Sequence, residues 1–490
     1  MKSVVMIAYF FPPEGNAGAF RPLRFVRHLP SRGWQPTVLT LDTDSFERYD
    51  PSLLSQVPSE VEVIRVRNRD PWQAFRAARE RRMRERISAA SKEVAVKIRS
   101  AHDRPLRSFV RELVRAVETW SYHPDTAMGW IRPAVKAAVR LCAKKRPDVI
   151  WATAGPVSSF VIAQHVSQRT GVPYVLDFRD AWTITHNEFE ERRPKWGKHL
   201  DWRNMFGLLK SAKAIVFRYE TEAECYWRAY EGALDASRIH IIPNGYEGGL
   251  DAFTPARSER CNLLYTGTLP DYRYDTLLQA LCTLKNASPD EAKRLHLQFI
   301  GEGMESLANE VATLGLNDLV SVSGPMSHEA VTRLSREADA LLLLGRAATM
   351  RGYELFAAAK LFGYLKAGRP IIGILPNDEA RKILLHVGVS TIADVDSVPE
   401  IVAVLRHLLQ SWRTGQLRAL VPDPNACQDY SAELQVDNLV RALDGEPASY
   451  AFIPGRVDIP ASLREAVHIR RRALRQKTLA AFCRTPTYSN

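Results

Sequence analysis

The chain alternates short apolar runs with helical patterns over most of its length. Between residues 1 and 245 the runs are continuously apolar, which is typical of strands buried on both faces of a parallel sheet. The pattern predicts strands at Val4–Phe10, Pro36–Leu41, Val61–Val66, Val149–Ala152, Tyr174–Phe178, Ala214–Phe217 and Ile239–Ile242. We therefore predict an α/β domain with a doubly wound parallel sheet over residues 1–245.

A second series of the same kind follows the turn-rich segment Ile242-Pro243-Asn244-Gly245. Its predicted strands are Asn262–Tyr265, Leu295–Ile300, Val320–Ser323, Ala340–Leu344 and Pro370–Ile374. These strands predict a second α/β domain over residues 246–425, and a helix in residues 426–444 is expected to pack back toward the first domain. A chain of 490 residues is too long for one core, so its length agrees with two domains.

Two segments depart from this alternation. Residues 67–148 interrupt the first domain with a helical, Arg-rich insertion that contains Arg79, Arg81, Arg82, Arg84 and Arg86. Residues 445–490 form a basic tail in which Arg464, His468, Arg471, Arg472 and Arg475 share one helical stripe. That layout is typical of a helix at a membrane interface, although a solvated helix or a disordered arm has the same pattern.

The formal net charge of +12 indicates an anionic partner. There is no zinc-finger spacing and no aromatic RNA-binding signature, so nucleic acid is not expected as a partner. The six cysteines form no C-x-x-C pair, which argues against a disulfide framework and a thiolate zinc site. No apolar run is long enough to span a membrane and no signal peptide is evident, so we expect a cytoplasmic location.

The first predicted strand runs into a Pro- and Gly-rich loop that precedes a helix. Ligands of doubly wound folds bind beyond the carboxyl ends of the strands, where a helix N-terminus offers N–H groups to an anion. The loop candidates for an acceptor or a phosphate are Gly15, Asn16, Ala17 and Gly18. Their spacing is neither a dinucleotide fingerprint nor a P-loop, and a plain strand-to-helix turn is the alternative.

The helix after this loop is basic on one side. Arg21, Arg24, Arg27 and His28 recur at helical spacing, whereas Leu23, Phe25, Val26 and Leu29 supply a core face. Some of these cations are candidates to face the crevice, although charges of this kind more commonly face water.

A second informative segment is Lys360–Ile372, which predicts a helix capped by glycine and followed by a buried strand. Together with the opening loop and the run Asp177-Phe178-Arg179-Asp180-Ala181-Trp182, this segment resembles glycosyltransferase family 4. Further local matches are His123-Pro124-Asp125 before Gly129-Trp130, Tyr265-Thr266-Gly267-Thr268-Leu269, and Asn244-Gly245. The resemblance covers about residues 1–444 and implies the GT-B fold, two facing Rossmann-like domains with a cleft between them.

The resemblance implies a retaining glycosyltransferase that moves a sugar from a nucleotide diphosphate sugar to an acceptor hydroxyl. The expected setting is cell-surface polysaccharide or glycolipid biosynthesis, with the nucleotide held by the C-terminal half and a sugar or lipid-linked acceptor by the N-terminal half. No cofactor is expected, because no D-x-D carboxylate pair follows a strand in the donor half. The basic insertion and tail suggest an anionic membrane surface as a further partner, and hence peripheral association with the inner face of the membrane.

Glycosyl transfer through an oxocarbenium-like state needs stabilisation of the departing diphosphate, which preorganised donors and cations supply. For the donor side, the resemblance points to Lys360 and Arg273 as catalytic cations and to Gly267, Thr268, Leu361 and Glu354 as further binding residues. On the acceptor side, Asp177 and Asp180 follow a strand end and are candidates to orient a hydroxyl or take its proton. The ordinary alternatives are a surface lysine at 360, a polar loop around Arg273, a helix cap at Asp180, and an Asp177–Arg179 pair.

One position departs from the family pattern. Gly363 stands in the lysine helix where the family commonly has a glutamate that binds the ribose hydroxyls, and glycine costs about 1 kcal/mol of helix stability relative to alanine. Glu354 is the candidate to replace that carboxylate. A catalytically silent GT-B scaffold is therefore an alternative to the enzyme, and a GT-B nucleotide-sugar epimerase is a third hypothesis.

Overall fold

The computed structural model describes residues 1–46, 48–69, 123–184, 195–230, 234–255, 258–270, 272–347, 352–465 and 467–468. The chain divides into two compact units. Unit 1 comprises Met1–Ile241, Asn438–Asp458 and the residues from Arg464 onward, and unit 2 comprises Ile242–Asp437 and Ile459–Leu463. The first change of unit falls at the start of the predicted turn-rich segment. The chain then returns to unit 1 within α17 (Ala432–Asp444).

Unit 1 is built on a seven-stranded sheet with the order β3-β2-β1-β4-β5-β6-β7, in which every pairing is parallel. The strands are β1 (Lys2–Ile7), β2 (Trp34–Leu41), β3 (Glu62–Val66), β4 (Val149–Thr153), β5 (Tyr174–Phe178), β6 (Ala214–Phe217) and β7 (Ile239–Ile241). Each corresponds to a predicted strand. The strand order reverses between β1 and β4, and such a switch point is where doubly wound folds bind ligands.

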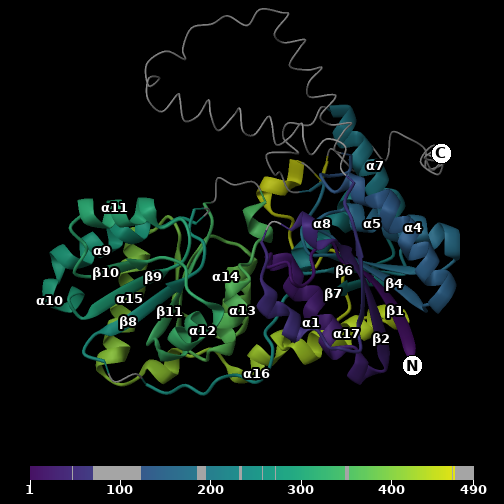
Figure 1. The fold of residues 1–490 in the computed structure, drawn as a ribbon. Helices are drawn as coiled ribbons and strands as arrows, with labels where there is room; N and C mark the ends of the chain where they lie inside the picture. Colours follow the sequence, from purple (N-terminus) through teal and green to yellow (C-terminus); the bar gives the residue numbers. More distant parts are fainter. Residues whose placement is uncertain are drawn as a thin grey trace, which may run out of the picture. The chain divides into compact units, whose positions relative to one another are not determined.

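The helices of unit 1 carry apolar faces toward this sheet. They are α1 (Phe20–His28), α4 (Met128–Lys145), α5 (Ser158–Thr170), α7 (Lys195–Ser211) and α8 (Glu220–Ala229). Short 3-10 turns occur at Ala17–Ala19, Pro30–Arg32, Thr43–Ser45, Pro51–Gln56 and Ala236–Arg238. Figure 1 shows α4, α5 and α7 side by side along one side of the sheet.

Helix α4 lies inside the predicted insertion but belongs to the fold of unit 1. Trp130, Ala134, Ala138 and Leu141 recur at helical spacing and are buried. The predicted insertion therefore extends too far at its C-terminal end, because a long helix covering a sheet has the same pattern as an inserted helix. Residues 70–122, which hold the rest of the insertion, lie outside the described residues.

The segment around Pro124-Asp125 joins two of these helices. One carboxylate oxygen of Asp125 accepts hydrogen bonds from the Ala127 amide (2.9 Å) and the Ser158 hydroxyl (2.6 Å), and the other accepts from the Ser158 amide (2.8 Å). Trp130 donates its indole N–H to the Val66 carbonyl oxygen at 3.1 Å. The family-like Pro-Asp-Trp motif is thus structural here: it caps α5 and fixes the start of α4 against β3.

Unit 2 is built on a six-stranded parallel sheet with the order β10-β9-β8-β11-β12-β13. The strands are β8 (Cys261–Thr266), β9 (Leu295–Ile300), β10 (Val320–Ser323), β11 (Ala340–Leu344), β12 (Ile371–Leu375) and β13 (Ile392–Asp394). All but β13 are predicted; β13 has three residues and one buried side chain, too little for a recognisable pattern. The order reverses between β8 and β11, which is the switch point of this unit.

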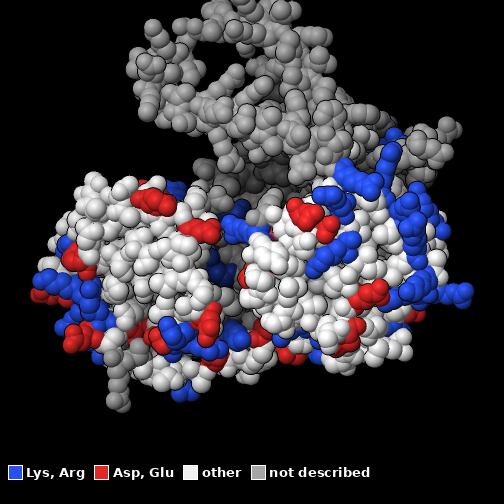
Figure 2. All heavy atoms as spheres, viewed as in Figure 1, with Lys and Arg blue, Asp and Glu red and all other residues white. Residues whose placement is uncertain are grey.

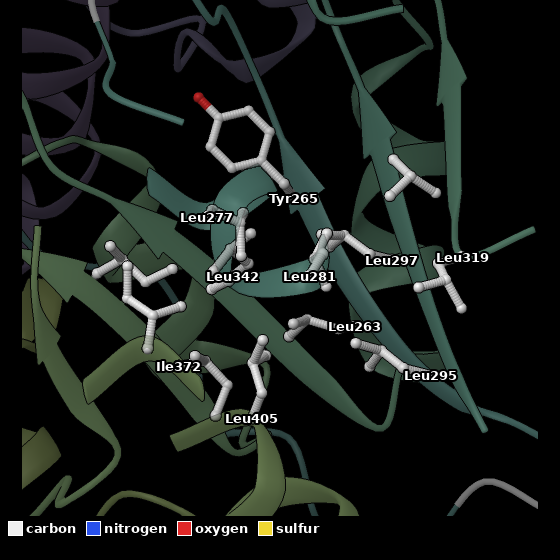
Figure 3. Packing of buried hydrophobic residues seen from close by; sticks show 14 of the residues in the cluster. Leu263, Tyr265, Leu277, Leu281, Leu295, Leu297, Leu319, Leu342, Ile372 and Leu405 are labelled. Atoms are coloured by element: carbon white, nitrogen blue, oxygen red, sulfur yellow. The ribbon is translucent and has the colours of Figure 1, made fainter. Parts of the chain in front are cut away.

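The helices of unit 2 are α9 (Asp275–Ala287), α10 (Pro289–Ala292), α11 (Glu305–Thr313), α12 (His328–Glu337), α13 (Lys360–Lys366), α14 (Glu379–His386), α15 (Val398–Arg413) and α16 (Pro424–Cys427). Further 3-10 turns lie at Tyr353–Leu355, Leu417–Leu420 and Gln428–Tyr430. Figure 3 shows the core between sheet and helices, where Leu263, Leu297 and Leu342 of the strands meet Leu281 of α9 and Leu405 of α15. Among the described residues, no helix is both long and apolar enough to cross a bilayer.

Candidate functional site

The strongest candidate site lies at the switch point of unit 2. Gly267 follows β8 with φ +112°, a conformation that favours glycine, and Lys360 begins α13. A Cβ placed on Gly267 would lie 3.0 Å from Nζ of Lys360, so the glycine lets the lysine approach the loop closely. The structure therefore brings these two predicted donor residues together.

Helix α13 is held against the end of β8. The hydroxyl of Tyr364 accepts a hydrogen bond from the Thr266 amide at 3.0 Å. Leu361, Phe362 and Leu365 of the same helix are buried. The role predicted for Leu361 in donor binding does not fit, because its side chain is fully buried in the core and anchors the helix that carries Lys360.

The ammonium group of Lys360 has an unusual environment. Its Nζ is buried and has no hydrogen-bond partner within the described part of the chain. It lies 3.8 Å from the centroid of the Tyr265 ring and 4.7 Å from that of Tyr272, in cation–π geometry. Burial lowers the pKa of Lys360 to about 7. A buried cation that lies against two aromatic rings and has no hydrogen-bond partner in the described chain is suited to an anionic ligand.

A second cation, Arg346, was not among the predicted site residues. It follows β11 across the switch point, and its guanidinium carbon lies 3.9 Å from the centroid of the Phe356 ring. Its backbone forms a bridge with Tyr272, whose ring lies 6.3 Å from that of Phe356. Arg346 is thus linked through two aromatic rings to the surroundings of Lys360. The sequence feature that could have identified Arg346 as a site residue is its position two residues after a predicted strand.

Arg273, predicted beside Lys360, makes different contacts. It pairs with Asp275 at 3.0 Å and with Asp396, and both carboxylates are about half exposed. With Tyr274 and Glu310 it lines an open pocket of about 410 Å³. Arg273 therefore belongs to a surface ion-pair network. This agrees better with the alternative that it is part of a polar loop than with a role as a buried phosphate-binding residue.

Thr268 and Glu354, the remaining predicted donor residues, differ in exposure. Thr268 is exposed, and its carbonyl oxygen accepts a hydrogen bond from the Tyr265 hydroxyl at 2.9 Å. Glu354 is buried and accepts a hydrogen bond from the Ser462 hydroxyl at 2.7 Å. One carboxylate oxygen of Glu354 is therefore used by the chain itself, and its role as a replacement for the missing glutamate stays a prediction. Gly363 is exposed, and no atom lies within 4 Å of an added Cβ.

In unit 1, Asp177 at the end of β5 is held by a buried ion pair. Arg21 of α1 donates to its carboxylate from Nη2 at 2.7 Å and from Nε at 3.0 Å, and the Thr153 hydroxyl donates at 2.8 Å. The two charged side chains are 2% and 0% exposed. The catalytic role predicted for Asp177 does not fit, because a fully enclosed and paired carboxylate holds α1 to the sheet. The predicted Asp177–Arg179 pair is also wrong.

Asp180, two residues after the end of β5, is exposed to solvent. Its side chain is 58% exposed, and Arg179 donates to it from Nη2 at 2.7 Å and from Nε at 3.1 Å. Arg179 itself is 16% exposed and packs between Gly18 and Gly155. A Cβ on Gly18 would lie 1.7 Å from Nη1 of Arg179, and a Cβ on Gly155 would lie 2.3 Å from Nη2. Arg179 and Asp180 thus form one preorganised unit. The helix-cap alternative for Asp180 stays a prediction, because residues 185–194 lie outside the described residues.

The loop beyond Asp180 is also held in a specific conformation. The Trp182 amide donates to the Tyr226 hydroxyl at 2.8 Å, and that hydroxyl in turn donates to the Trp182 carbonyl oxygen. Thr183 has φ +68°, which is unfavourable for a β-branched residue and typically costs about 1–3 kcal/mol. Such strain persists where the surrounding contacts determine the conformation, often next to functional groups.

The opening loop uses two of its backbone donors within the chain. The Gly18 amide donates to the Asn16 side chain at 3.0 Å, and the Gly15 amide donates to the Arg48 carbonyl oxygen at 2.8 Å. Ala17 is exposed and begins a short 3-10 turn. These amides are used by the chain itself, so the alternative of a strand-to-helix turn describes the loop better, with Gly18 making room for Arg179.

Metal-binding residues do not gather in the described part of the chain. No group of three or more His, Cys, Asp or Glu side chains there is placed to hold a metal ion. The thiols of Cys142, Cys261, Cys282 and Cys427 form no disulfide within the described residues.

Comparison with known proteins agrees with this architecture. Residues 88–247 match the model of Glycosyltransferase Family 4. A search of curated proteins found no matching sequence.

Several solved structures share the fold. Sucrose-phosphate synthase from Thermosynechococcus elongatus matches with a TM-score of 0.57 and 14% identity, covering 91% of this chain and 99% of its own. A glycosyltransferase from Rickettsia africae matches with a TM-score of 0.56 and 12% identity, and the match covers 90% of this chain and 98% of that protein. TarM from S. aureus, crystallised with Fondaparinux, alpha-GlcNAc-glycerol and UDP, matches with a TM-score of 0.53 and 8% identity, covering 91% and 100%.

The two parallel sheets and these matches confirm the fold expected from the sequence motifs. They also confirm the resemblance to the family, with the family match itself confined to residues 88–247. The chain has the GT-B fold, and its residues 88–247 match Glycosyltransferase Family 4.

Proposed function

We propose that the protein transfers a sugar from a nucleotide diphosphate sugar to an acceptor hydroxyl with retention of the anomeric configuration. The observation that carries the proposal is the buried ammonium of Lys360, which lies against two tyrosine rings beside Gly267 and has no hydrogen-bond partner in the described chain. A buried charge without a partner is costly, and a diphosphate would supply the missing anion. The UDP in the TarM structure named above is a ligand of this chemical class.

In this proposal Lys360, with Arg346 nearby, stabilises the charge that develops on the departing diphosphate. A preorganised cation in a partly dehydrated site typically contributes about 3–4 kcal/mol to a transition state of this kind. The carboxylate of Asp180, held by Arg179, orients the acceptor hydroxyl. The negative charge of the diphosphate is met by side-chain cations, and we keep the expectation that no metal cofactor is needed.

The acceptor and the cellular setting are proposals of the same kind. We propose a sugar or lipid-linked acceptor in cell-surface polysaccharide or glycolipid assembly, with the protein acting at the inner face of the membrane. The excess of 67 Lys and Arg over 55 Asp and Glu supports an anionic membrane surface as a partner.

The test is a transfer assay with UDP-, GDP-, dTDP- and ADP-sugars and a panel of sugar and lipid-linked acceptors, with products detected by mass spectrometry. A new glycoside that contains the donor sugar, formed by the wild type and lost in Lys360→Met, supports the proposal. Nucleotide binding without any transfer would favour the second candidate, a catalytically silent scaffold, for which Gly363 in place of a carboxylate is the supporting observation.

A further inference from the structure

The outer face of α4 carries a row of cations. Arg132, Lys136, Arg140 and Lys144 repeat every four residues along the helix, and all four are exposed. Residues at this spacing are neighbours on one side of a helix. Figure 2 shows Lys and Arg side chains gathered along this side of unit 1, over α4 and the helices beside it.

No acidic group of the described chain forms an ion pair with this row, although the charge of Lys144 contributes, after that of Lys145, to lowering the pKa of Glu62. Neither α4 nor α5, which packs against it, contains an Asp or Glu. Lys145, one residue beyond the row, pairs with Glu62, whereas none of the four cations has an ion pair in the described residues. Like charges at this spacing repel one another and destabilise the helix. A row of this kind is therefore suited to an anionic partner that neutralises it.

The chemistry of the face indicates which partner fits. Its exposed side chains are cations with Ala143 between them, and no aromatic side chain is exposed on α4. A specific protein interface would offer an apolar core with aromatic anchors, and a single-stranded nucleic acid site would offer rings for base stacking. Charge without such groups fits a surface of many anionic head groups, which attracts each nearby Lys or Arg.

We propose that the α4 row, defined as Arg132, Lys136, Arg140 and Lys144, docks unit 1 on an anionic lipid bilayer. This places the contact on α4, a folded helix within the predicted insertion, rather than on the cluster Arg79–Arg86 or on the tail. The choice of a bilayer over other polyanions rests on the proposed function, in which the acceptor is lipid-linked. The charge argument itself does not depend on sugar transfer.

The test is co-sedimentation of the full chain with vesicles of phosphatidylcholine and phosphatidylglycerol in equal parts, compared with phosphatidylcholine alone. The variant is Lys136→Gln, Arg140→Gln and Lys144→Gln combined. The matched control is Arg333→Gln, Arg413→Gln and Arg418→Gln, which removes three exposed cations from unit 2 and lowers the net charge by the same amount. Circular dichroism verifies that both variants fold.

We expect the wild type to bind the mixed vesicles, to dissociate at high salt and to leave the neutral vesicles unbound. The α4 variant should bind on the order of a hundredfold more weakly, since each cation near the surface contributes about a factor of five. Equal binding by the α4 variant and the control would overturn the proposal. So would binding to duplex DNA with no binding to vesicles. Lys360→Met should bind vesicles like the wild type, so a failure of the donor site is distinguished from a failure of membrane docking.

Discussion

The guanidinium of Arg179 fills the space that a side chain at Gly18 would need: a Cβ on Gly18 would lie 1.7 Å from Nη1 of Arg179. Gly18 belongs to the loop after β1, whereas Arg179 belongs to the loop after β5 and pairs with the exposed carboxylate of Asp180. The glycine in the opening loop therefore serves a side chain from another loop, and the two loops set the position of Asp180 together.

Gly18→Ala should disturb this arrangement. The added methyl group requires Arg179 to move, and such overpacking typically costs about 1–3 kcal/mol of unfolding free energy. Urea unfolding measures the change. The control is Gly207→Ala on α7, where the single nearby atom lies 3.8 Å from the added Cβ. That change should be neutral or stabilising by up to about 1 kcal/mol. An unchanged midpoint for Gly18→Ala would show that Arg179 is not confined there.

Asp177→Ala should destabilise the chain far more than Asp180→Ala. Removing Asp177 breaks the buried ion pair with Arg21, which typically costs about 3–5 kcal/mol. The Arg179–Asp180 pair involves a half-exposed carboxylate, for which the expected loss is about 1 kcal/mol or less. Combining Arg21→Met with Asp177→Leu should recover much of the first loss. Similar stability of the two single variants would contradict the structural role given to Asp177.

Donor binding should depend on pH through Lys360. Burial lowers its pKa to about 7 in the unliganded protein, and an anionic diphosphate should raise it. UDP-glucose, whose diphosphate does not titrate near neutral pH, should then bind with proton uptake. Above pH 7 its affinity should fall by roughly tenfold per pH unit. Calorimetry in two buffers of different ionisation enthalpy measures the uptake. Affinity that is independent of pH would refute this role.

The same group affects stability in the absence of ligand. Because the pKa of Lys360 falls from 10.5 to about 7 on folding, the folded chain holds fewer protons than the unfolded chain between these values. The contribution of Lys360 to the unfolding free energy should therefore rise with pH from about 7 to 10.5 and be lost as pH falls through 7. Thermal melting of the wild type and of Lys360→Met over this pH range measures this contribution. If the stabilities of the two proteins change with pH in parallel, the pKa of Lys360 is not shifted.

Substitutions at Gly363 test the effect of this position on stability and on nucleotide binding separately. Gly363→Ala should stabilise the chain by about 1 kcal/mol, because the position is helical, exposed and has no atom within 4 Å of an added Cβ. Gly363→Glu should increase nucleotide affinity by roughly tenfold if its carboxylate reaches the ribose hydroxyls. Gly363→Gln is the matched control. Transfer that appears only in Gly363→Glu would mean that the natural chain is a silent scaffold.

The fold was largely predictable because buried parallel strands are continuously apolar. Every strand was predicted except β13, which is too short to have a pattern. The first change of unit falls at the predicted turn-rich segment. The C-terminal end of the insertion was misjudged, since α4 has the amphipathic pattern of any surface helix. Whether such a helix covers the sheet or extends from it depends on tertiary contacts that the pattern does not contain.

The site was predicted less well, for a physical reason. Sequence identifies which residues follow strands, but the partner of each charge depends on the neighbouring loops. Asp177 and Asp180 look equivalent in the chain, yet one faces Arg21 inside unit 1 and the other faces solvent. Likewise Arg273 and Arg346 both follow strands at the switch point, but only Arg346 stacks on the ring that neighbours Tyr272.

The most direct test of the donor site is thermal stabilisation by UDP-, GDP-, dTDP- and ADP-sugars of the wild type, Lys360→Met and Lys366→Met. Lys366 lies on the same helix, so its variant controls for changes in α13 itself. Ligand at about 100 times its Kd should stabilise the wild type by roughly 2.7 kcal/mol. The account predicts that one nucleotide class stabilises the wild type and Lys366→Met but not Lys360→Met. Equal stabilisation of all three proteins would contradict the assignment of the donor site to Lys360.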